Sequence, residues 1–382
     1  MQKQFSRRKF LKSAGILGLM STLPLPLQKC ASSESEYPRP NILWITAEDI
    51  SPALGCYGDS YAKTPTLDAL AEDGILYENA FATAPICAPA RSSLITGIYA
   101  TSLGTQHLRS EIPVPEDLKI LPQYLREQGY FTTNNSKTDY NFDPSGRWDQ
   151  NGSDAHWRNR LGDEPFFSVF NFGITHEGHA NRDAPQDVET LDSLHDPEQA
   201  PVPPYHPDTP EMRDIWAHQY DLISVLDQRV NDILIQLEED GLAEDTIVFF
   251  FADHGFGQPR YKRWMYNTGI QVPFIVHVPQ KFRRFLDTSS GERREELVSF
   301  IDFAPTVLHL CQTEIPGEMV GQTFLGPERD EPRKFIYGAR SRADDIYDVS
   351  RAIRDERYIY IRNYMPHRSY IREAIIFSDR KR

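Results

Sequence analysis

The sequence predicts an α/β protein in which a central, largely parallel sheet carries helices on both faces. Short apolar segments, bounded by turn residues as buried parallel strands are, alternate with segments whose apolar residues recur every three or four positions, as in helices. The chain has 382 residues, of which 40% are hydrophobic, enough to cover both faces of a large sheet. Beyond residue 330 the helical segments cease, and the pattern predicts a small antiparallel β subdomain.

The strands of the main sheet are expected at short apolar segments. Several of these segments are apolar at consecutive positions, as strands covered on both faces are. They cover residues 41–46, 166–172, 246–252 and 274–278. In the C-terminal subdomain, an antiparallel meander is expected over residues 335–339, 349–354 and 358–363.

Helices are expected between the strands of the main sheet. The longest covers residues 212–240, where apolar residues recur with helical spacing until Gly241 provides a stop. Shorter helices are expected over residues 65–74 and 118–128. Residues 178–210 are polar, rich in Pro, Asp and His and without periodicity, so we expect a long loop over the strand ends.

The first thirty residues are expected to be an export signal. Arg7 and Arg8 precede an apolar stretch over residues 14–27, which is too short to span a bilayer. This pattern resembles a twin-arginine signal, which implies the twin-arginine export machinery as a partner. The alternative is an ordinary Sec signal whose basic region contains two arginines. Both interpretations predict an exported protein, in the periplasm or at the cell surface.

The cysteines of the chain suggest separate roles. Cys30 ends the apolar stretch and precedes a polar tether over residues 31–39, as the lipid-anchored cysteine of a lipoprotein would. Lys29 is a poor residue before such a site, so an unmodified Cys30 is the alternative. The other cysteines are too few for a disulfide scaffold, which leaves at least one for another role. They are Cys56, Cys87 and Cys311.

The charge of the chain limits its partners. The formal net charge is −14. Proteins that bind nucleic acids need a basic surface to displace counterions from phosphates, so we expect no nucleic-acid partner. An anionic substrate would have to bind in a local cationic pocket.

The segment that begins at Cys87 carries the most specific motif. It reads Cys-Ala-Pro-Ala-Arg and continues into Leu-Ile-Thr-Gly. This resembles the maturation signature of type I sulfatases, which implies that a formylglycine-generating or anaerobic maturase enzyme oxidises Cys87 to formylglycine. The hydrated aldehyde offers one hydroxyl to attack sulfur and another to expel sulfate. The alternative is a buried structural cysteine in a helix whose first turn contains Pro89.

Two acidic pairs follow predicted strands, at the edge of an α/β sheet where ligands gather. They are Glu48-Asp49 and Asp253-His254. The resemblance implies that these residues, together with Cys87, bind one divalent cation, Ca²⁺ rather than Mg²⁺. The family has Asp at the position of Glu48, so this longer side chain is a departure. The alternative for each pair is an acidic cap on a loop.

The resemblance also implies three catalytic residues besides Cys87. Arg91 would hold the Cys87 loop and stabilise the developing alkoxide. Lys137 aligns with the lysine of a Lys-x-His motif, in which Asp139 replaces the histidine and alters the proton handling. His176 aligns with a histidine that contacts sulfate and protonates the leaving group, although a lone loop histidine is the alternative.

Further residues align with substrate-binding positions. Lys262 matches a second sulfate-binding cation, and the adjacent Arg263 competes for that role. His107 and Arg109 are candidates for contact with the sugar, with a solvated turn as the alternative. Asp302 lies near an expected helix start, which indicates a structural role.

These motifs occur in family order along most of the chain, which is therefore identified as a member of the type I, formylglycine-dependent sulfatases. It most resembles bacterial sulfatases grouped with the heparan N-sulfatases (N-sulfoglucosamine sulfohydrolases). The resemblance implies an alkaline-phosphatase-like fold and hydrolysis of sulfate esters or sulfamates in a sulfated polysaccharide or oligosaccharide.

Two other functions remain open. One is a phosphonate monoester or phosphodiester hydrolase, which would use the same formylglycine. The other is a truncated, non-catalytic protein that binds glycans, because residues 369–382 are basic and lack the expected helix and strand. The expected domains are an export signal, a tether, a catalytic domain and an incomplete C-terminal subdomain. They cover residues 1–30, 31–39, 40–330 and 331–382.

Overall fold

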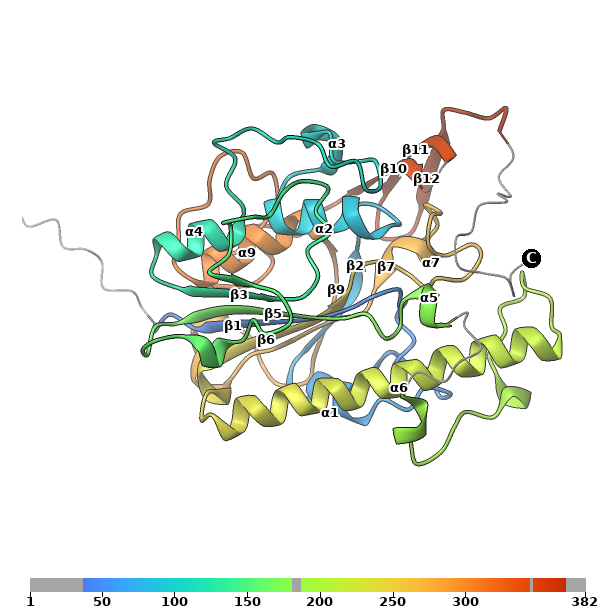
Figure 1. Cartoon of the computed structure of the whole chain (residues 1–382), viewed down its shortest axis with the longest axis horizontal. Helices are drawn as coiled ribbons and strands as arrows, with labels where there is room; N and C mark the ends of the chain where they lie inside the picture. Colours follow the sequence, from blue (N-terminus) through green and yellow to red (C-terminus); the bar gives the residue numbers. More distant parts are fainter. Residues whose placement is uncertain (1–36, 181–186, 344–345, 369–382) are drawn as a thin grey trace, which may run out of the picture. The chain divides into compact units, whose positions relative to one another are not determined.

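The computed structural model describes residues 37–180, 187–343 and 346–368 (Figure 1). The expected export signal, Cys30 and residues 369–382 lie outside these ranges. Within them, no helix combines the length and apolar character needed to cross a membrane.

A mixed sheet forms the centre of the described structure. Its order is β4-β3-β5-β1-β6-β8-β2-β7, with β9 paired to β2. From β4 to β6 all neighbours are parallel, whereas β8 is antiparallel to both β6 and β2. The strands are β1 (Asn41–Ala47), β2 (Ile75–Phe81), β3 (Phe131–Asn135), β4 (Gln150–Asn151), β5 (Phe166–Phe172), β6 (Thr246–Ala252), β7 (Gln271–Val272), β8 (Phe274–His277) and β9 (Glu292–Ser299).

The central strands form where apolar residues follow one another without interruption. Every residue of β1 and β6 is buried, as in a parallel sheet covered on both faces. The indole of Trp44 lies edge-on to Phe167 and Phe251, with ring centroids 5.0 and 5.4 Å away. The predictions for β5 and β6 match their bounds, whereas β1 is one residue longer and β8 one residue shorter than predicted.

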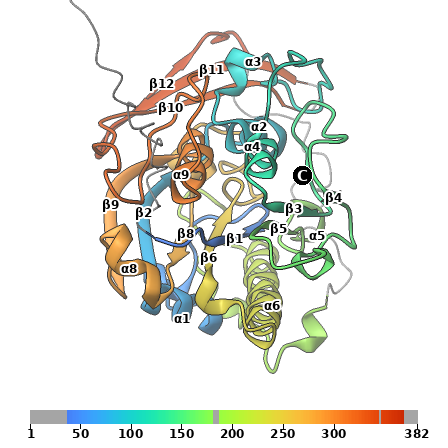
Figure 2. The same cartoon turned by 90° about the vertical axis from the view of Figure 1, so that its left-hand side faces the viewer.

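Helices cover both faces of the sheet, as predicted (Figures 1 and 2). One face carries α1 (Pro65–Asp73) and α6 (Pro210–Glu239), and the other carries α2 (Cys87–Thr96), α4 (Leu121–Glu127) and α9 (Phe303–Leu310). Shorter helices are α3 (Ala100–Leu103), α5 (Glu177–Ala180), α7 (Asn267–Ile270) and α8 (Gln280–Leu286). Single 3₁₀ turns occupy Gly55–Tyr57, Trp157–Asn159, Val188–Thr190, Pro197–Gln199, Ala243–Asp245 and Phe300–Asp302.

The helix α6 begins two residues before its predicted start. Thr209 caps it, because its Oγ1 accepts a hydrogen bond from the Met212 N–H at 3.3 Å. The described part of the preceding polar segment packs along this helix, where the His195 N–H donates to Asp221 Oδ1 at 2.8 Å. Further along the segment, the Tyr205 hydroxyl donates to that of Tyr261, in the loop after β6, at 3.0 Å.

A second sheet follows the main one, as predicted. It is the antiparallel meander β10 (Ile336–Ala343), β11 (Ile346–Arg354) and β12 (Ile359–Asn363). Its buried face packs against Phe81 of β2 and Met265.

Asp302 has the surroundings of a structural residue. Its carboxylate accepts hydrogen bonds from the N–H groups of Ser299 and Gln322, both at 2.8 Å, and pairs with Arg333. It therefore fixes the start of α9 to the segment that leads into the second sheet.

Candidate active site

Four strands of the main sheet bring the candidate residues to one edge. Ala47, the last residue of β1, is in register with Ala252 of β6 and Phe172 of β5. The acidic pairs follow β1 and β6 directly, and His176 and Lys137 come shortly after β5 and β3. Parallel pairing thus gathers side chains that are more than 200 positions apart in the sequence.

Cys87 is the first residue of α2 and is buried. Its Sγ lies 3.1 Å from Nε2 of His254, whose Nδ1–H donates to the carbonyl of Gly255 at 2.9 Å. Burial alone would raise the pKa of the Cys87 thiol, but the nearby Lys262 and Lys137 bring it below its usual value. The site therefore stabilises negative charge on the side chain at position 87.

Arg91 lies one turn further along α2 and joins the strand ends. Its Nε donates to Asp253 Oδ2 at 3.2 Å and its Nη1 to Asn171 Oδ1 at 2.7 Å. Its Nη2 lies 3.6 Å from Glu48 Oε1. The guanidinium thereby fixes α2 to the carboxyl ends of β1, β5 and β6.

Asp49 is held from several directions. Its Oδ2 accepts hydrogen bonds from the Glu177 N–H and from Lys262 Nζ, both at 2.8 Å. Its backbone is left-handed, with φ 53°, a conformation that residues other than glycine seldom adopt. Gly257 is required nearby, because a Cβ there would lie 2.3 Å from that of Glu177. The surrounding packing therefore fixes the direction of the Asp49 carboxylate.

The structure distinguishes the two adjacent cations. Lys262 points into the site, where its Nζ contacts both oxygens of Asp49 and lies 3.3 Å from Nε2 of His176. Arg263 instead forms a bidentate pair with Glu177, at 2.9 and 2.8 Å. Lys262 is therefore the cation next to Cys87, and Arg263 supports the loop that carries His176.

Lys137, which is partly exposed, forms an ion pair with the buried Glu48. Since Arg91 also approaches the Glu48 carboxylate, two cations already balance its charge. The other side of Lys137 faces Asp139, whose Oδ2 lies 3.7 Å from Nζ. Glu48 thus lies at the margin of the site, beside Lys137.

Two groups of potential metal ligands share the Cys87 side chain. In each group, the ligand atoms all lie within 4.8 Å of one another. One group adds Asp49 and His176 to Cys87, and the other adds Asp253 and His254. Glu48, which the resemblance adds to the ligand set, belongs to neither group.

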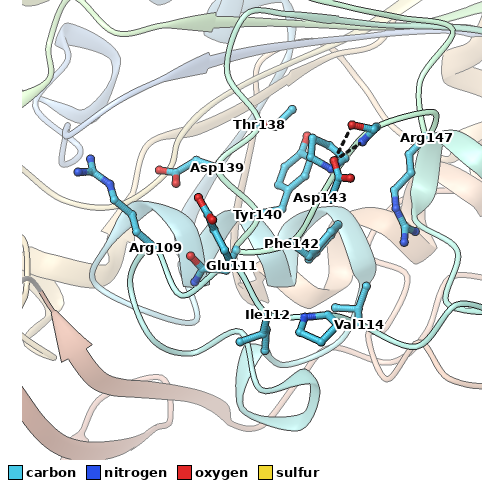
Figure 3. Close-up of a pocket in the computed structure, with 14 residues that line it drawn as sticks. Arg109, Glu111, Ile112, Val114, Thr138, Asp139, Tyr140, Phe142, Asp143 and Arg147 are labelled. Atoms are coloured by element: carbon cyan, nitrogen blue, oxygen red, sulfur yellow. Dashed lines mark hydrogen bonds between the residues drawn. The ribbon is translucent and has the colours of Figure 1, made fainter.

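His107 and Arg109 are not gathered around Cys87. His107 Nδ1 accepts a hydrogen bond from the backbone N–H of Arg342 at 3.2 Å, and its ring lies 5.4 Å from that of Tyr347. It therefore connects its loop to the second sheet. Arg109 lines a pocket next to Asp139 (Figure 3).

Two residues of the site were missed in the sequence. Asn171 lies in β5, and Glu177 is the first residue of α5. Their partners are distant in the sequence, because Arg91 is 80 positions from Asn171 and Arg263 is 86 positions from Glu177. The only local signal was the position of Glu177 beside His176 at a predicted strand end. Their pairing depends on the tertiary arrangement of separate loops.

Comparisons with known proteins identify the family of this chain. The family model described as Sulfatase matches residues 40–160 and 154–313. An ulvan-active sulfatase of Formosa agariphila is 38% identical over 377 residues, covering 87% of this chain and 62% of the relative. Human N-sulphoglucosamine sulphohydrolase is 28% identical over 356 residues, covering 79% of this chain and 68% of the relative. The chain thus spans less than two thirds of the length of the first of these relatives.

A solved structure shows the same fold. The phosphonate monoester hydrolase of Agrobacterium radiobacter matches with a TM-score of 0.68 and 18% identity, covering 85% of this chain and 87% of that one. The fold is therefore the alkaline-phosphatase-like one that the sequence predicted. Sulfatases generally use a metal ion and a formylglycine. With a family model that matches most of its length, the chain belongs to the sulfatase family.

Proposed function

We propose that this protein hydrolyses sulfate esters or sulfamates of a sulfated polysaccharide or oligosaccharide, with the residue at position 87 as the nucleophile. The observation that carries the proposal is the position of Cys87 at the start of α2, next to His254 and close to Lys137 and Lys262. Cations are needed there because both the substrate and the transition state are anionic.

The nucleophile requires modification of Cys87. A maturase would supply the oxidant that converts the thiol into the aldehyde of formylglycine. Once hydrated, this side chain provides one hydroxyl to attack sulfur and a second that expels sulfate as the aldehyde forms again. Burial lowers the pKa of His254, but Asp253 raises it to about 9, so the ring is protonated at neutral pH. Its Nε2 lies 3.1 Å from the present Sγ and can donate a hydrogen bond to a hydroxyl at that position.

The acidic residues fit a divalent cation. Oδ1 of Asp49 and Oδ1 of Asp253 lie 3.3 and 3.6 Å from His254 Nε2, which also contacts Cys87, so the carboxylates converge around one point. Burial raises the pKa of Asp253, but His254 and Arg91 lower it to about 2, which keeps this carboxylate ionised. Asp49 and Asp253 would hold the cation, which would neutralise charge on the sulfate oxygens. Irregularly arranged oxygens suit Ca²⁺ better than Mg²⁺.

The remaining cations suit a bound sulfate. Lys137 follows β3 and Lys262 follows β6, which lie on either side of β5 and β1, and the two lysines pair with Glu48 and Asp49, respectively. Burial lowers the pKa of His176, but Asp49 raises it above its usual value, which favours the protonated ring. His176 can therefore give a proton to the oxygen or nitrogen that leaves sulfur.

The relatives suggest where to look for the substrate. The relative with 38% identity is described as ulvan-active, and another acts on N-sulphoglucosamine. We therefore propose oligosaccharides of ulvan as the first substrates to test, followed by N-sulfated glucosamine. A phosphonate monoester is the competing substrate class.

The experiment compares sulfate release by the parent protein, expressed with a maturase, with that of Cys87→Ala. Ulvan oligosaccharides and 4-nitrocatechol sulfate are the substrates, and an aryl phosphonate monoester is the competitor. The matched control is Cys56→Ala, which removes a thiol outside the site. We expect Cys87→Ala alone to lose activity while its thermal unfolding stays that of a folded protein. Turnover by Cys87→Ala, or a higher kcat/KM on the phosphonate, would overturn the proposal.

The location of the protein is part of the proposal. Arg7 and Arg8 followed by the apolar stretch suggest export by the twin-arginine route to the periplasm or cell surface, with Cys30 as a candidate lipid anchor. Replacing both arginines by lysine should retain the protein in the cytoplasm. Export of that variant would indicate the Sec route instead.

A further inference from the structure

A large pocket lies beside the Cys87 site, between residues 109–114 and 138–147 (Figure 3). Its volume is about 940 Å³, at the upper end of the ~300–1,000 Å³ typical of ligand pockets. Asp139, in its wall, lies 3.7 Å from the Nζ of Lys137, which pairs with Glu48 in the candidate active site. The pocket and the site therefore share an edge.

The backbone around the pocket is held in an uncommon conformation. Four residues of its wall other than glycine have positive φ, which L-residues adopt only where surrounding contacts enforce it. They are Arg109 (53°), Glu111 (42°), Asp139 (52°) and Asn141 (62°). Glu and Arg gain little from this conformation, so the tertiary structure must maintain it.

Asn141 holds the backbone in this conformation, because its hydrogen bonds join the two walls of the pocket. Its Nδ2 donates to the carbonyls of Thr105 at 2.6 Å and His107 at 2.8 Å. Its Oδ1 accepts from the Ser110 N–H at 3.3 Å, and its own carbonyl accepts from the Ile112 N–H at 3.0 Å. These four hydrogen bonds fix the loop before α4 against the loop after β3. The pocket is therefore preformed.

The polar groups of the pocket are unevenly distributed. Figure 3 shows Arg109, Glu111 and Asp139 toward one end, and Phe142 and Arg147 toward the other. Arg147 already donates to the Leu118 carbonyl at 2.7 Å and to Gln123 Oε1 at 2.9 Å. Within the described residues, by contrast, no hydrogen bond or ion pair engages the side chains of Arg109 and Glu111.

The polar groups at this end of the pocket suit hydroxyls better than a second anion. The carboxylates of Glu111 and Asp139 accept hydrogen bonds, as from neighbouring sugar hydroxyls, and the Arg109 guanidinium donates them. A sulfate or carboxylate in the same place would be repelled by both carboxylates. Sugar hydroxyls can use all three groups at once.

We infer that this pocket is a subsite for an uncharged, hydroxyl-rich sugar unit next to the unit whose sulfate is held at position 87. The inference rests on the proposed function. It assigns Glu111, Asp139 and Arg109 to sugar binding and Asn141 to positioning the walls.

The test uses two oligosaccharides that contain the same sulfated sugar unit. In one the neighbouring unit is uncharged, and in the other it is sulfated. The reference substrate is 4-nitrocatechol sulfate, which contains no sugar. The parent protein should have the higher kcat/KM for the oligosaccharide whose neighbouring unit is uncharged. In Glu111→Gln and Arg109→Gln, the ratio of kcat/KM for that oligosaccharide to kcat/KM for the aryl sulfate should fall about tenfold or more, chiefly through KM, as loss of a charge-assisted hydrogen bond implies. Glu116→Gln, which alters an exposed carboxylate outside the pocket, should leave the ratio unchanged.

An unchanged ratio in both pocket variants would overturn the subsite. A preference for the sulfated neighbour that Arg109→Gln removes would overturn the assignment to an uncharged sugar. If the parent hydrolyses none of the compounds, the proposed function has failed, and calorimetric titration with a desulfated, carboxyl-reduced ulvan oligosaccharide, which is uncharged, tests the pocket by itself. Binding that is weakened in Glu111→Gln supports it, whereas no binding, or equal binding, contradicts it.

Discussion

The Nζ of Lys262 lies 2.8 Å from Oδ2 and 3.0 Å from Oδ1 of Asp49, and both side chains are buried. Burial lowers the pKa of Lys262, but Asp49 and other nearby anionic groups raise it well above its usual value. The ammonium therefore keeps its charge in a buried site beside Cys87. The pair maintains a cation where the substrate sulfate is expected.

Replacing Lys262 tests this relationship. In Lys262→Met, kcat/KM for 4-nitrocatechol sulfate should fall by about 10²–10³, the size of effect typical of removing one group that stabilises an anionic transition state. Steady-state kinetics on the mature protein measure it. Lys119→Met, which removes an exposed lysine, is the control. A Lys262→Met protein as active as this control would exclude the lysine from sulfate binding.

The Glu177–Arg263 pair should contribute to folding. Glu177→Gln leaves Arg263 buried without its bidentate partner, so the free energy of unfolding should fall by about 3–5 kcal/mol. Urea denaturation provides the measurement. The matched control is Glu127→Gln, which breaks an exposed pair with Lys119 and should cost about 0–1 kcal/mol. Equal losses in the two variants would show that burial of the pair has no special effect.

A bound cation should affect stability as well as activity. Chelation should abolish sulfate release, and Ca²⁺ should restore it more effectively than Mg²⁺. Ca²⁺ at about 100 times its Kd should also stabilise the fold by about 2.7 kcal/mol, visible as a rise in Tm. Asp253→Asn should lose this rise, whereas Asp117→Asn, at an exposed position, should keep it. A rise that persists in Asp253→Asn would place the cation elsewhere.

Asn141 should act through the shape of the pocket. Asn141→Ala removes the side-chain hydrogen bonds to Thr105, His107 and Ser110, so the loop before α4 should become more mobile. We expect faster proteolysis within residues 105–112 and a higher KM for oligosaccharides than in the parent. Limited proteolysis followed by peptide mapping detects the first effect. Unchanged cleavage together with an unchanged KM would contradict the positioning role.

The sequence predicted the strands that are buried on both faces. Mostly apolar residues reveal β5 and β6, because every residue of these strands except Asn171 and Phe172 is buried. It did not reveal β9 (Glu292–Ser299), which begins with five consecutive charged residues and in which several side chains reach solvent. That strand forms because β2 pairs with it, which is information carried by another part of the chain.

The same limit applies to the site. Residues directly after predicted strands, such as Asp49 and Asp253, could be expected at one sheet edge from the geometry of parallel sheets. The sequence could not show whether Lys262 or Arg263 faces Cys87, because the side chains of adjacent residues in an irregular loop have no fixed direction. The direction of Arg263 depends on its ion pair with Glu177, which belongs to a separate loop.

Mass spectrometry of the peptide that contains Cys87 shows whether this residue is converted to formylglycine. The protein would be expressed with a competent maturase, and a known sulfatase matured in the same cells would serve as the control. We expect the thiol of Cys87 to be replaced by an aldehyde, while Cys56 and Cys311 remain thiols. A Cys87 that stays a thiol although the control is converted would contradict the account and favour a non-catalytic, glycan-binding role.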